Sequence, residues 1–250
     1  MSQTLLFAGR NVRRFFRSRP NLVSVLLFPL LLMLMQLALA GKIVTAAAHG
    51  AYVDRLAPDI ILVTAAFGTT VTALAMLNDI RSGLLDRVRT LPVSAFSVLG
   101  GRVVGDVARV LLVALIATGV AYLPGFRFTQ GALAVLGFYG VVALFATMVT
   151  ALGVLAGLSF KGMDTIRAVV GNPVLLLFLF SSGFVPVAEF PDFLQPFVRA
   201  NPISIAATAL YGLSHGGPVA LPLLETLAWT LGVSACCVPL AIRRYRRLVR

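Results

Sequence analysis

The chain has 250 residues, of which 59% are apolar and only 12% are charged, and its formal net charge is +12. Soluble domains are about half apolar and about a quarter charged, so the composition excludes an ordinary soluble domain and indicates an integral membrane protein. The basic residues lie in short segments beside apolar runs, without the basic and aromatic surface stretches of a nucleic-acid-binding protein. We therefore attribute the net charge to orientation in the membrane.

The N-terminal residues 2–19 predict a basic amphipathic helix that lies on an anionic membrane surface. One face is apolar, and the opposite face carries the membrane-surface residues Arg10, Arg13, Arg14 and Arg17. The paired arginines and the apolar run after them are also typical of a twin-arginine signal. However, the run Leu22–Ala40 is longer than the roughly 7–15 apolar residues of a signal peptide, and further spans follow it. We therefore expect a retained transmembrane helix.

Six apolar runs are long enough to cross a bilayer, which takes about 20 helical residues. They are Leu22–Ala40, Ile60–Leu77, Val103–Leu123, Ala132–Leu158, Ala168–Val187 and Val219–Ile242. We therefore predict an all-α integral membrane fold, with six transmembrane helices in a single domain over residues 1–250. Residues 41–59 are expected to form a short external loop that contains Asp54 and Asp59.

The basic residues also predict the orientation of the chain. All but four of the 21 lysines and arginines lie in the N-terminal helix, in residues 78–109, in residues 159–167 or in the C-terminal tail. Cytoplasmic segments are enriched in such residues, so we expect a multi-pass protein of the cell inner (cytoplasmic) membrane with both termini in the cytoplasm. The even number of spans agrees with this arrangement.

The segment 78–92, NDIRSGLLDRVRTLP, is the most charged internal stretch and joins the second and third predicted spans. Leu84, Leu85 and Val88 are spaced i, i+1, i+4, which predicts a short amphipathic helix that ends before Pro92. Two interpretations are open at this point. The segment is either a contact surface for a partner or a basic loop that only sets the topology.

Residues 186–213, between the fifth and sixth predicted spans, combine prolines with apolar side chains. The prolines are Pro186, Pro191, Pro196 and Pro202, and they exclude one continuous helix. Phe190, Phe193 and Phe197 make the stretch too apolar for a solvated loop. We predict short re-entrant or interfacial helices at the outer face.

Two motifs resemble those of ABC-2 type permeases, the membrane halves of ATP-driven exporters, and of their daunorubicin-resistance group in particular. The coupling segment of that family resembles Asp79, Arg81, Gly83, Leu84, Leu85, Arg87 and the run Leu91-Pro92-Val93-Ser94, although many members have Glu-Arg-Glu and then Gly-Thr. The second motif comprises Gly183-Phe184-Val185-Pro186, Phe190-Pro191 and Asn201-Pro202-Ile203-Ser204, which follow in the family's order. Together these features extend over nearly the whole chain.

The resemblance implies a transmembrane permease subunit of an ATP-driven exporter. Two such subunits, identical or paralogous, enclose one path and rest on two ATPase chains, with residues 2–19 as an elbow helix among the membrane lipids. The residues that this implies for the contact with the ATPase are Asp79, Arg81, Leu84, Leu85, Asp86, Arg87, Val88 and Arg89. Residues 159–167 are a second, smaller candidate for that contact.

In the family that the chain resembles, the second and fifth spans line the transport path. The residues that this implies for the substrate path are Thr64, Phe67, Thr69, Thr70, Asn172, Phe178, Ser181 and Ser182. Such a weakly polar cavity suits amphipathic drugs or lipids better than sugars or ions. Small hydroxyl side chains also join helices by hydrogen bonds, so packing is the alternative role for each of them.

The chain carries no motif for chemistry of its own. Gly41-Lys42 lacks the remainder of a Walker loop, so we expect ATP and Mg²⁺ on a separate ATPase subunit and neither a cofactor nor an enzymatic activity here. Neither His49 nor His215 has a partner at metal-site spacing, so we expect no metal and take both as loop histidines.

Charged residues are scarce inside the predicted spans, which argues against the alternative of a secondary transporter and leaves a non-transporting membrane scaffold as a further alternative. Glu225 is the exception, either a proton or substrate site or a carboxylate that reaches the outer interface. Arg102, Asp106 and Arg109 are able to pair along one helical face, but we expect them mainly to anchor the third span at the interface.

Overall fold

The computed structural model describes residues 27, 30–35, 38, 46–83, 95–183 and 187–249. In these ranges the chain is all helical and has no strand, as the sequence predicts. The helix expected over residues 2–19 lies outside the described residues. So do most of the first predicted span and residues 84–94, which hold most of the predicted coupling segment.

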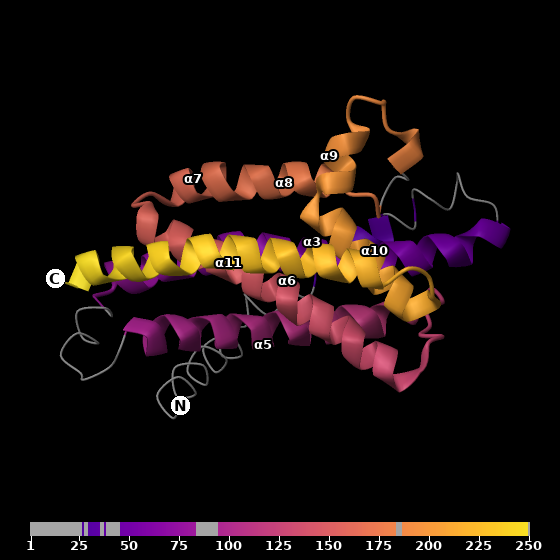
Figure 1. The fold of residues 1–250 in the computed structure, drawn as a ribbon, viewed down its shortest axis with the longest axis horizontal. Helices are drawn as coiled ribbons and strands as arrows, with labels where there is room; N and C mark the ends of the chain where they lie inside the picture. The colour runs from indigo at the N-terminus through magenta and orange to yellow at the C-terminus, as the bar shows by residue number, and fades with distance from the viewer. Residues whose placement is uncertain are drawn as a thin grey trace.

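Four helices in the described ranges are long and apolar enough to cross a membrane. They are α3 (Ala46–Arg81), α5 (Ala95–Ala121), α6 (Gly131–Ser159) and α11 (Ala220–Val249). These helices correspond to the second, third, fourth and sixth predicted spans and run along the long axis of the molecule (Figure 1). The fifth predicted span, Ala168–Val187, begins inside the π-helical turn η1 (Arg167–Gly171), which follows α7 (Met163–Ile166), and its helical part ends with α8 (Asn172–Leu179). The full count of six transmembrane helices stays a prediction.

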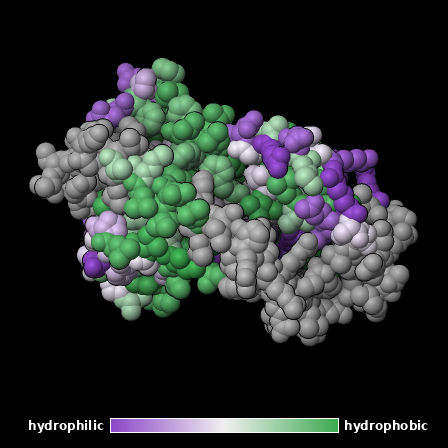
Figure 2. Space-filling view, turned by 180° about the vertical axis from the view of Figure 1, so that it is seen from behind, coloured by the Kyte–Doolittle hydropathy of each residue, from purple (hydrophilic) through white to green (hydrophobic). Residues whose placement is uncertain are grey.

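Helix α6 lies at the centre of the bundle, in contact with α3, α5, α10 (Pro202–His215) and α11. Phe138, Val142, Phe145 and Ala146 are essentially fully buried along it. The outer surface is apolar, because helices such as α11 turn exposed leucines outward, where lipid tails would surround them. Figure 2 shows apolar residues over much of the described face and hydrophilic residues gathered mainly at one end, the end of the C-terminus in Figure 1.

The contact between α3 and α6 depends on two glycines one helical turn apart, Gly153 and Gly157. A Cβ atom on Gly153 would lie 2.6 Å from the carbonyl oxygen of Thr69, which is closer than real Cβ atoms come to backbone. Small residues at this spacing let two helix backbones approach closely in a membrane. They fix the position of α3 against the core.

The external loop predicted over residues 41–59 is wrong for its second part, because α3 is helical from Ala46 onward. Leu56, Ala57 and Ile60 are buried in a second apolar cluster. The cluster also contains Ala121, the last residue of α5, and Phe126, in the loop that follows α5. This packing continues the helix beyond the apolar run, and Pro58 is accommodated inside it.

Residues 187–215 are broken into η2 (Val187–Glu189), α9 (Gln195–Ala200) and α10. Asn201 makes the junction: its side chain accepts a hydrogen bond from Ile203 N at the start of α10. It also donates to the carbonyl oxygens of Leu177 and Phe180, at 2.7 and 3.0 Å, which the end of α8 leaves without helical partners. Helix α10 is packed among α3, α6 and α11, and the re-entrant character of residues 186–213 stays a prediction.

Candidate functional site

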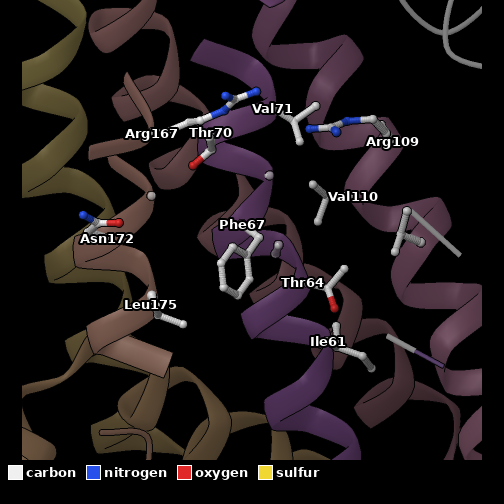
Figure 3. A pocket seen from close by; sticks show the side chains of 14 residues that line it. Ile61, Thr64, Phe67, Thr70, Val71, Arg109, Val110, Arg167, Asn172 and Leu175 are labelled. Atoms are coloured by element: carbon white, nitrogen blue, oxygen red, sulfur yellow. The ribbon is translucent and has the colours of Figure 1, made fainter. Parts of the chain in front are cut away.

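A cavity of about 540 Å³ lies between α3, α5 and the η1–α8 segment (Figure 3). Most of the residues that line it are apolar, among them Ile61, Val71, Val110 and Leu175. The polar members are Thr64, Thr70, Asn172, Arg109 and Arg167. The space is large enough for a drug-sized ligand, and an apolar wall with a few polar groups is typical of a small-molecule site.

Four of the residues predicted for the substrate path line this cavity: Thr64, Phe67, Thr70 and Asn172. The three on α3 share one helical face, because side chains three and four positions apart lie on the same side of a helix. Phe178 extends the same wall, since its ring meets that of Phe67 edge-on at a centroid distance of 6.2 Å.

The other three predicted path residues lie away from the cavity. Thr69 is buried on the opposite side of α3, where it meets Gly153 of α6. Ser181 donates a hydrogen bond to Asp59, and the backbone N–H of Ser182 donates to Ser204 Oγ at 3.0 Å. The structure therefore places these three in contacts between helices.

The π-helical turn η1 brings Arg167 and Gly171 to the cavity wall, directly before Asn172. Pro173 has no N–H, so the carbonyl of Val169 has no α-helical donor four residues on. A wider turn relieves this conflict, and π turns inside helices frequently occur at functional sites. The sequence interpretation missed the turn, although Pro173 within an apolar run was the signal for it.

Two arginines occupy one end of the cavity, and the sequence interpretation did not assign either of them to it. Arg109 comes from α5 and Arg167 from η1, on opposite walls (Figure 3). The Arg109 side chain is only 9% exposed, and its Nε lies 3.6 Å from Asp106 Oδ1. Arg167 is largely exposed, with Nη1 3.3 Å from Asp164 Oδ1. Among the described residues that line the cavity, none is acidic.

Arg109 is the last member of a buried ion-pair network between α3 and α5. Arg102 Nη1 donates to Asp79 Oδ2 at 2.5 Å, and Arg102 Nε lies 3.6 Å from Asp106 Oδ2. Thr72 Oγ1 donates to the same Asp106 oxygen at 2.8 Å. The expectation that Arg102, Asp106 and Arg109 mainly anchor the helix at the interface is wrong, because all three are paired, and their side chains are about nine-tenths buried.

The described part of the predicted coupling segment is the C-terminal end of α3. Asp79 is 3% exposed and belongs to the buried network. Arg81 is exposed, and its Nη2 donates to the carbonyl oxygen of Lys161 at 2.5 Å. This hydrogen bond links the end of α3 to the segment that follows α6. Leu84, Leu85, Asp86, Arg87, Val88 and Arg89 lie outside the described residues.

In the N-terminal half of α3, Asp59 is fully buried, although the sequence interpretation placed it in a loop. It accepts the hydrogen bond from Ser181, and its Oδ2 has no hydrogen-bond partner within the described residues. His215 is not a loop residue but the last residue of α10, with Nε2 2.9 Å from Asp54 Oδ1. Glu225 is exposed on α11 and does not line the cavity.

Comparison with known proteins gives a family match over most of the chain. Residues 2–213 match a sequence model of the ABC-2 type transporter family. A relative from Mycobacterium tuberculosis, named as a probable doxorubicin resistance ABC transporter permease protein DrrC, is 32% identical over 248 residues, which cover 99% of this chain and 89% of the relative. The daunorubicin resistance ABC transporter permease protein DrrB1 of Streptomyces coeruleorubidus is 31% identical over 250 residues, which cover 98% of this chain and 87% of that protein.

Proposed function

Because the chain belongs to the ABC-2 type transporter family and is a transmembrane permease of an ABC drug exporter, we propose that it moves amphipathic drugs or lipids out of the cytoplasm. The observation that carries this proposal is the cavity between α3, α5 and the η1–α8 segment. Its apolar wall and few polar groups suit a molecule with an apolar body and a polar head. The resistance named for both relatives supports a drug-like substrate.

ATP hydrolysis belongs to a separate ATPase subunit in this proposal, which binds ATP and Mg²⁺ while the permease itself holds no cofactor. The ATPase contacts residues 78–92, where Leu84, Leu85 and Val88 fill an apolar groove and Arg81, Asp86, Arg87 and Arg89 pair at its rim. Asp79 connects this segment to the bundle through Arg102. Two permease subunits, identical or paralogous, form the complete path.

The orientation of this assembly follows from charge. In the described ranges, one end of the bundle holds Arg81 at the end of α3, Lys161 between α6 and α7, Arg167 in η1 and the arginines of residues 243–247 in the last turns of α11. We assign that end to the cytoplasm, which places both termini there. The residues Arg10, Arg13, Arg14 and Arg17 then lie against the anionic cytoplasmic leaflet.

We infer that α3 couples the ATPase contact to the cavity. Asp79 begins the contact segment, and Thr70, Phe67 and Thr64 of the same helix line the cavity. The ion pairs from Asp79 through Arg102 and Asp106 to Arg109 run along α5 to the same cavity. Movement of residues 78–92 therefore reaches the α3 and α5 walls of the cavity through buried contacts.

The experiment that tests the proposal measures ATP hydrolysis by the purified complex of permease and ATPase. We expect amphipathic compounds to stimulate hydrolysis and hydrophilic saccharides to have no effect, because the cavity wall is apolar. The ATPase subunit alone is the control and should not respond. Stimulation by saccharides and not by amphipaths would overturn the assignment of substrate class.

A further inference from the structure

We propose that the last turns of α11 bind the head group of an anionic phospholipid in the membrane leaflet at that end of the bundle. The site is the arginine face of α11, which consists of Arg243, Arg244, Arg246 and Arg247. These turns lie beside the C-terminus (Figure 1). None of the four side chains lines the cavity, so this site is separate from the proposed transport path.

The four arginines share the outward side of α11. Each of them is exposed, whereas Ala241 and Tyr245 in the same turns are buried. Successive residues of an α-helix are turned by about 100°, so the arginines cover roughly 160° of the helix, opposite the two buried residues. The arginine face therefore points away from the bundle and toward the membrane.

The arginine face lies at the depth of the lipid head groups. The residues from Leu221 to Leu240 carry one charge, that of Glu225, and as a helix they extend about 30 Å, which is the thickness of the hydrocarbon core. Arg243 to Arg247 follow within about 10 Å of Leu240, where the phosphates of the leaflet lie.

The same side of α11 is apolar where it crosses the hydrocarbon. Trp229, Cys236 and Leu240 are exposed and precede Arg243 by fourteen, seven and three positions, spacings that keep side chains on one helical face. This stripe meets acyl chains first and head groups next, in the order in which a phospholipid presents them. An acidic protein surface matches only the basic part of the stripe, whereas an anionic phospholipid matches both parts.

The described residues do not neutralise the arginine face. Residues 226–249 contain no Asp or Glu, and none of the four arginines forms an ion pair with another described residue. Like charges three and four positions apart on a helix repel each other. A lipid phosphate relieves this repulsion, and its oxygens accept charge-assisted hydrogen bonds from the planar guanidinium groups.

The inward side of the same turns packs against the end of α3. Tyr245 and Ala241 belong to an apolar cluster that also contains Met76 of α3 and Leu99 of α5. Ile80, in the last turn of α3, packs against this cluster. A head group that neutralises the outward side should therefore stabilise these turns of α11 together with the helix ends behind them.

The test measures which lipid lies beside the arginine face. Trp229, the only tryptophan of the chain, is replaced by Phe, and Leu240→Trp places a single reporter one turn before Arg243. The full-length permease is reconstituted in phosphatidylcholine vesicles that contain equal fractions of brominated phosphatidylglycerol or brominated phosphatidylcholine, and bromine quenches the fluorescence of a neighbouring tryptophan. We expect phosphatidylglycerol to be favoured by about five-fold or more, because each arginine near the surface attracts anionic lipid.

Side-chain variants connect the preference to the arginine face. A four-glutamine variant should lose the preference, and the corresponding four-lysine variant should keep most of it, because lysine retains the charge. The glutamine changes are Arg243→Gln, Arg244→Gln, Arg246→Gln and Arg247→Gln. Leu221→Trp, at the other end of α11, is the matched control: this position is 65% exposed and one turn from Glu225, so its reporter should show no preference for phosphatidylglycerol.

The unmodified permease provides a second measurement that needs no reporter. Its thermal midpoint should be higher in nanodiscs of phosphatidylcholine with phosphatidylglycerol than in phosphatidylcholine alone. The four-glutamine variant should unfold at the same temperature in both.

Three results would overturn the lipid site. The first is equal quenching of the Leu240→Trp reporter by the two brominated lipids. The second is loss of the preference when inorganic phosphate is added in excess, because the arginines would then bind free anions. The third is equal quenching together with loss of the ATPase from the four-glutamine variant in a pull-down, which would show that the arginine face binds a protein. None of these results bears on the transport of amphipathic substrates through the cavity.

Discussion

At the scale of single residues, the contact between Asp79 and Arg102 decides how the C-terminal end of α3 is held against α5. Both side chains are about nine-tenths buried or more, and the shortest distance between Arg102 Nη1 and Asp79 Oδ2 is 2.5 Å. A buried ion pair adds little net stability compared with apolar residues of the same shape, but the loss of one partner leaves an uncompensated charge. The pair therefore fixes the geometry of α3 against α5 more than it adds stability.

The double substitution in this pair should consequently cost less stability than the sum of the two single substitutions. We expect Asp79→Asn and Arg102→Gln each to lower the free energy of unfolding by about 3–5 kcal/mol, and the double variant to lose less than the sum. Thermal unfolding of the purified permease in detergent measures the effect. Strictly additive losses would show that the two side chains do not act as a pair.

Individual residues also show how much of the candidate site could be predicted from the sequence. Thr64, Phe67 and Thr70 follow from the resemblance to the family, and they do line the cavity. The place of Arg109 in the cavity wall does not follow from the sequence, because it depends on how α5 packs against Gly68 of α3. The burial of Asp59 does not follow from the sequence either, because a carboxylate at the edge of an apolar run has the same neighbours in sequence whether it is exposed or buried.

At the scale of the helices, the closest packing is that of α3 against α6 through glycines. Gly153 and Gly157 leave no room for a side chain between the two backbones, whereas Gly140 of the same helix is exposed, and a Cβ atom there would meet nothing within 4 Å. Packing of backbones through small residues is a main source of stability between helices in lipid. The position of the cavity wall on α3 depends on this contact.

Gly153→Ala should therefore destabilise the permease, because its Cβ atom would lie 2.6 Å from a backbone carbonyl oxygen and the helices must move apart. Overpacking of this kind typically costs about 1–3 kcal/mol. Gly140→Ala is the matched control on the same helix and should be neutral or slightly stabilising, since alanine is the better helix former. The thermal midpoint of each variant checks this, and a Gly153→Ala protein as stable as Gly140→Ala would refute the packing.

The coupling segment makes a second prediction at this scale. Apolar anchors buried in a groove contribute more to binding than exposed ion pairs, which are worth about 0–1 kcal/mol. Leu84→Asp or Leu85→Asp should therefore release the ATPase, while Arg87→Ala should do much less. Pull-down of the ATPase measures this, with permease levels in the membrane as the control for insertion. Full retention of the ATPase by both leucine variants would contradict this prediction, and residues 159–167 would then be the candidate for the contact.

The helices themselves were predictable where hydropathy alone determines them. The runs in α5, α6 and α11 appear in the structure as helices that continue beyond at least one end of each run, because a long apolar run has no alternative to a helix in lipid. The sequence did not reveal the part of α3 that precedes Ile60, where Leu56 and Ala57 lie in one apolar cluster with Phe126, a residue far away in the chain. The π turn at Arg167–Gly171 was missed for a local reason, the effect of Pro173.

At the scale of the whole molecule, the family match excludes the alternatives of a secondary transporter and of a non-transporting scaffold. The scarcity of charged residues in the spans argued from the sequence against the secondary transporter only. The paired charges that the structure does bury lie between α3 and α5, next to the predicted ATPase contact. This arrangement suits a permease that is driven from outside the membrane by a partner.

Orientation is testable on the whole molecule by labelling introduced cysteines, after replacement of Cys236 and Cys237 by alanine. Ala188 and Ser82 are both exposed and lie at opposite ends of the bundle. With the basic end in the cytoplasm, Ala188→Cys should react with an impermeant maleimide in intact cells, and Ser82→Cys only after permeabilisation. The reverse pattern would show that the orientation is inverted.

The central claim is that the cavity between α3, α5 and the η1–α8 segment is the path of an amphipathic substrate. The most direct test is ATP-dependent uptake of a fluorescent amphipathic drug into inside-out vesicles that contain the complex. Val71→Trp fills the cavity wall at an exposed position, and Leu231→Trp places the same side chain on the exposed face of α11. We predict that Val71→Trp abolishes uptake while the ATPase remains bound, and that Leu231→Trp transports normally. Uptake by Val71→Trp at the rate of the unmodified complex would contradict the claim.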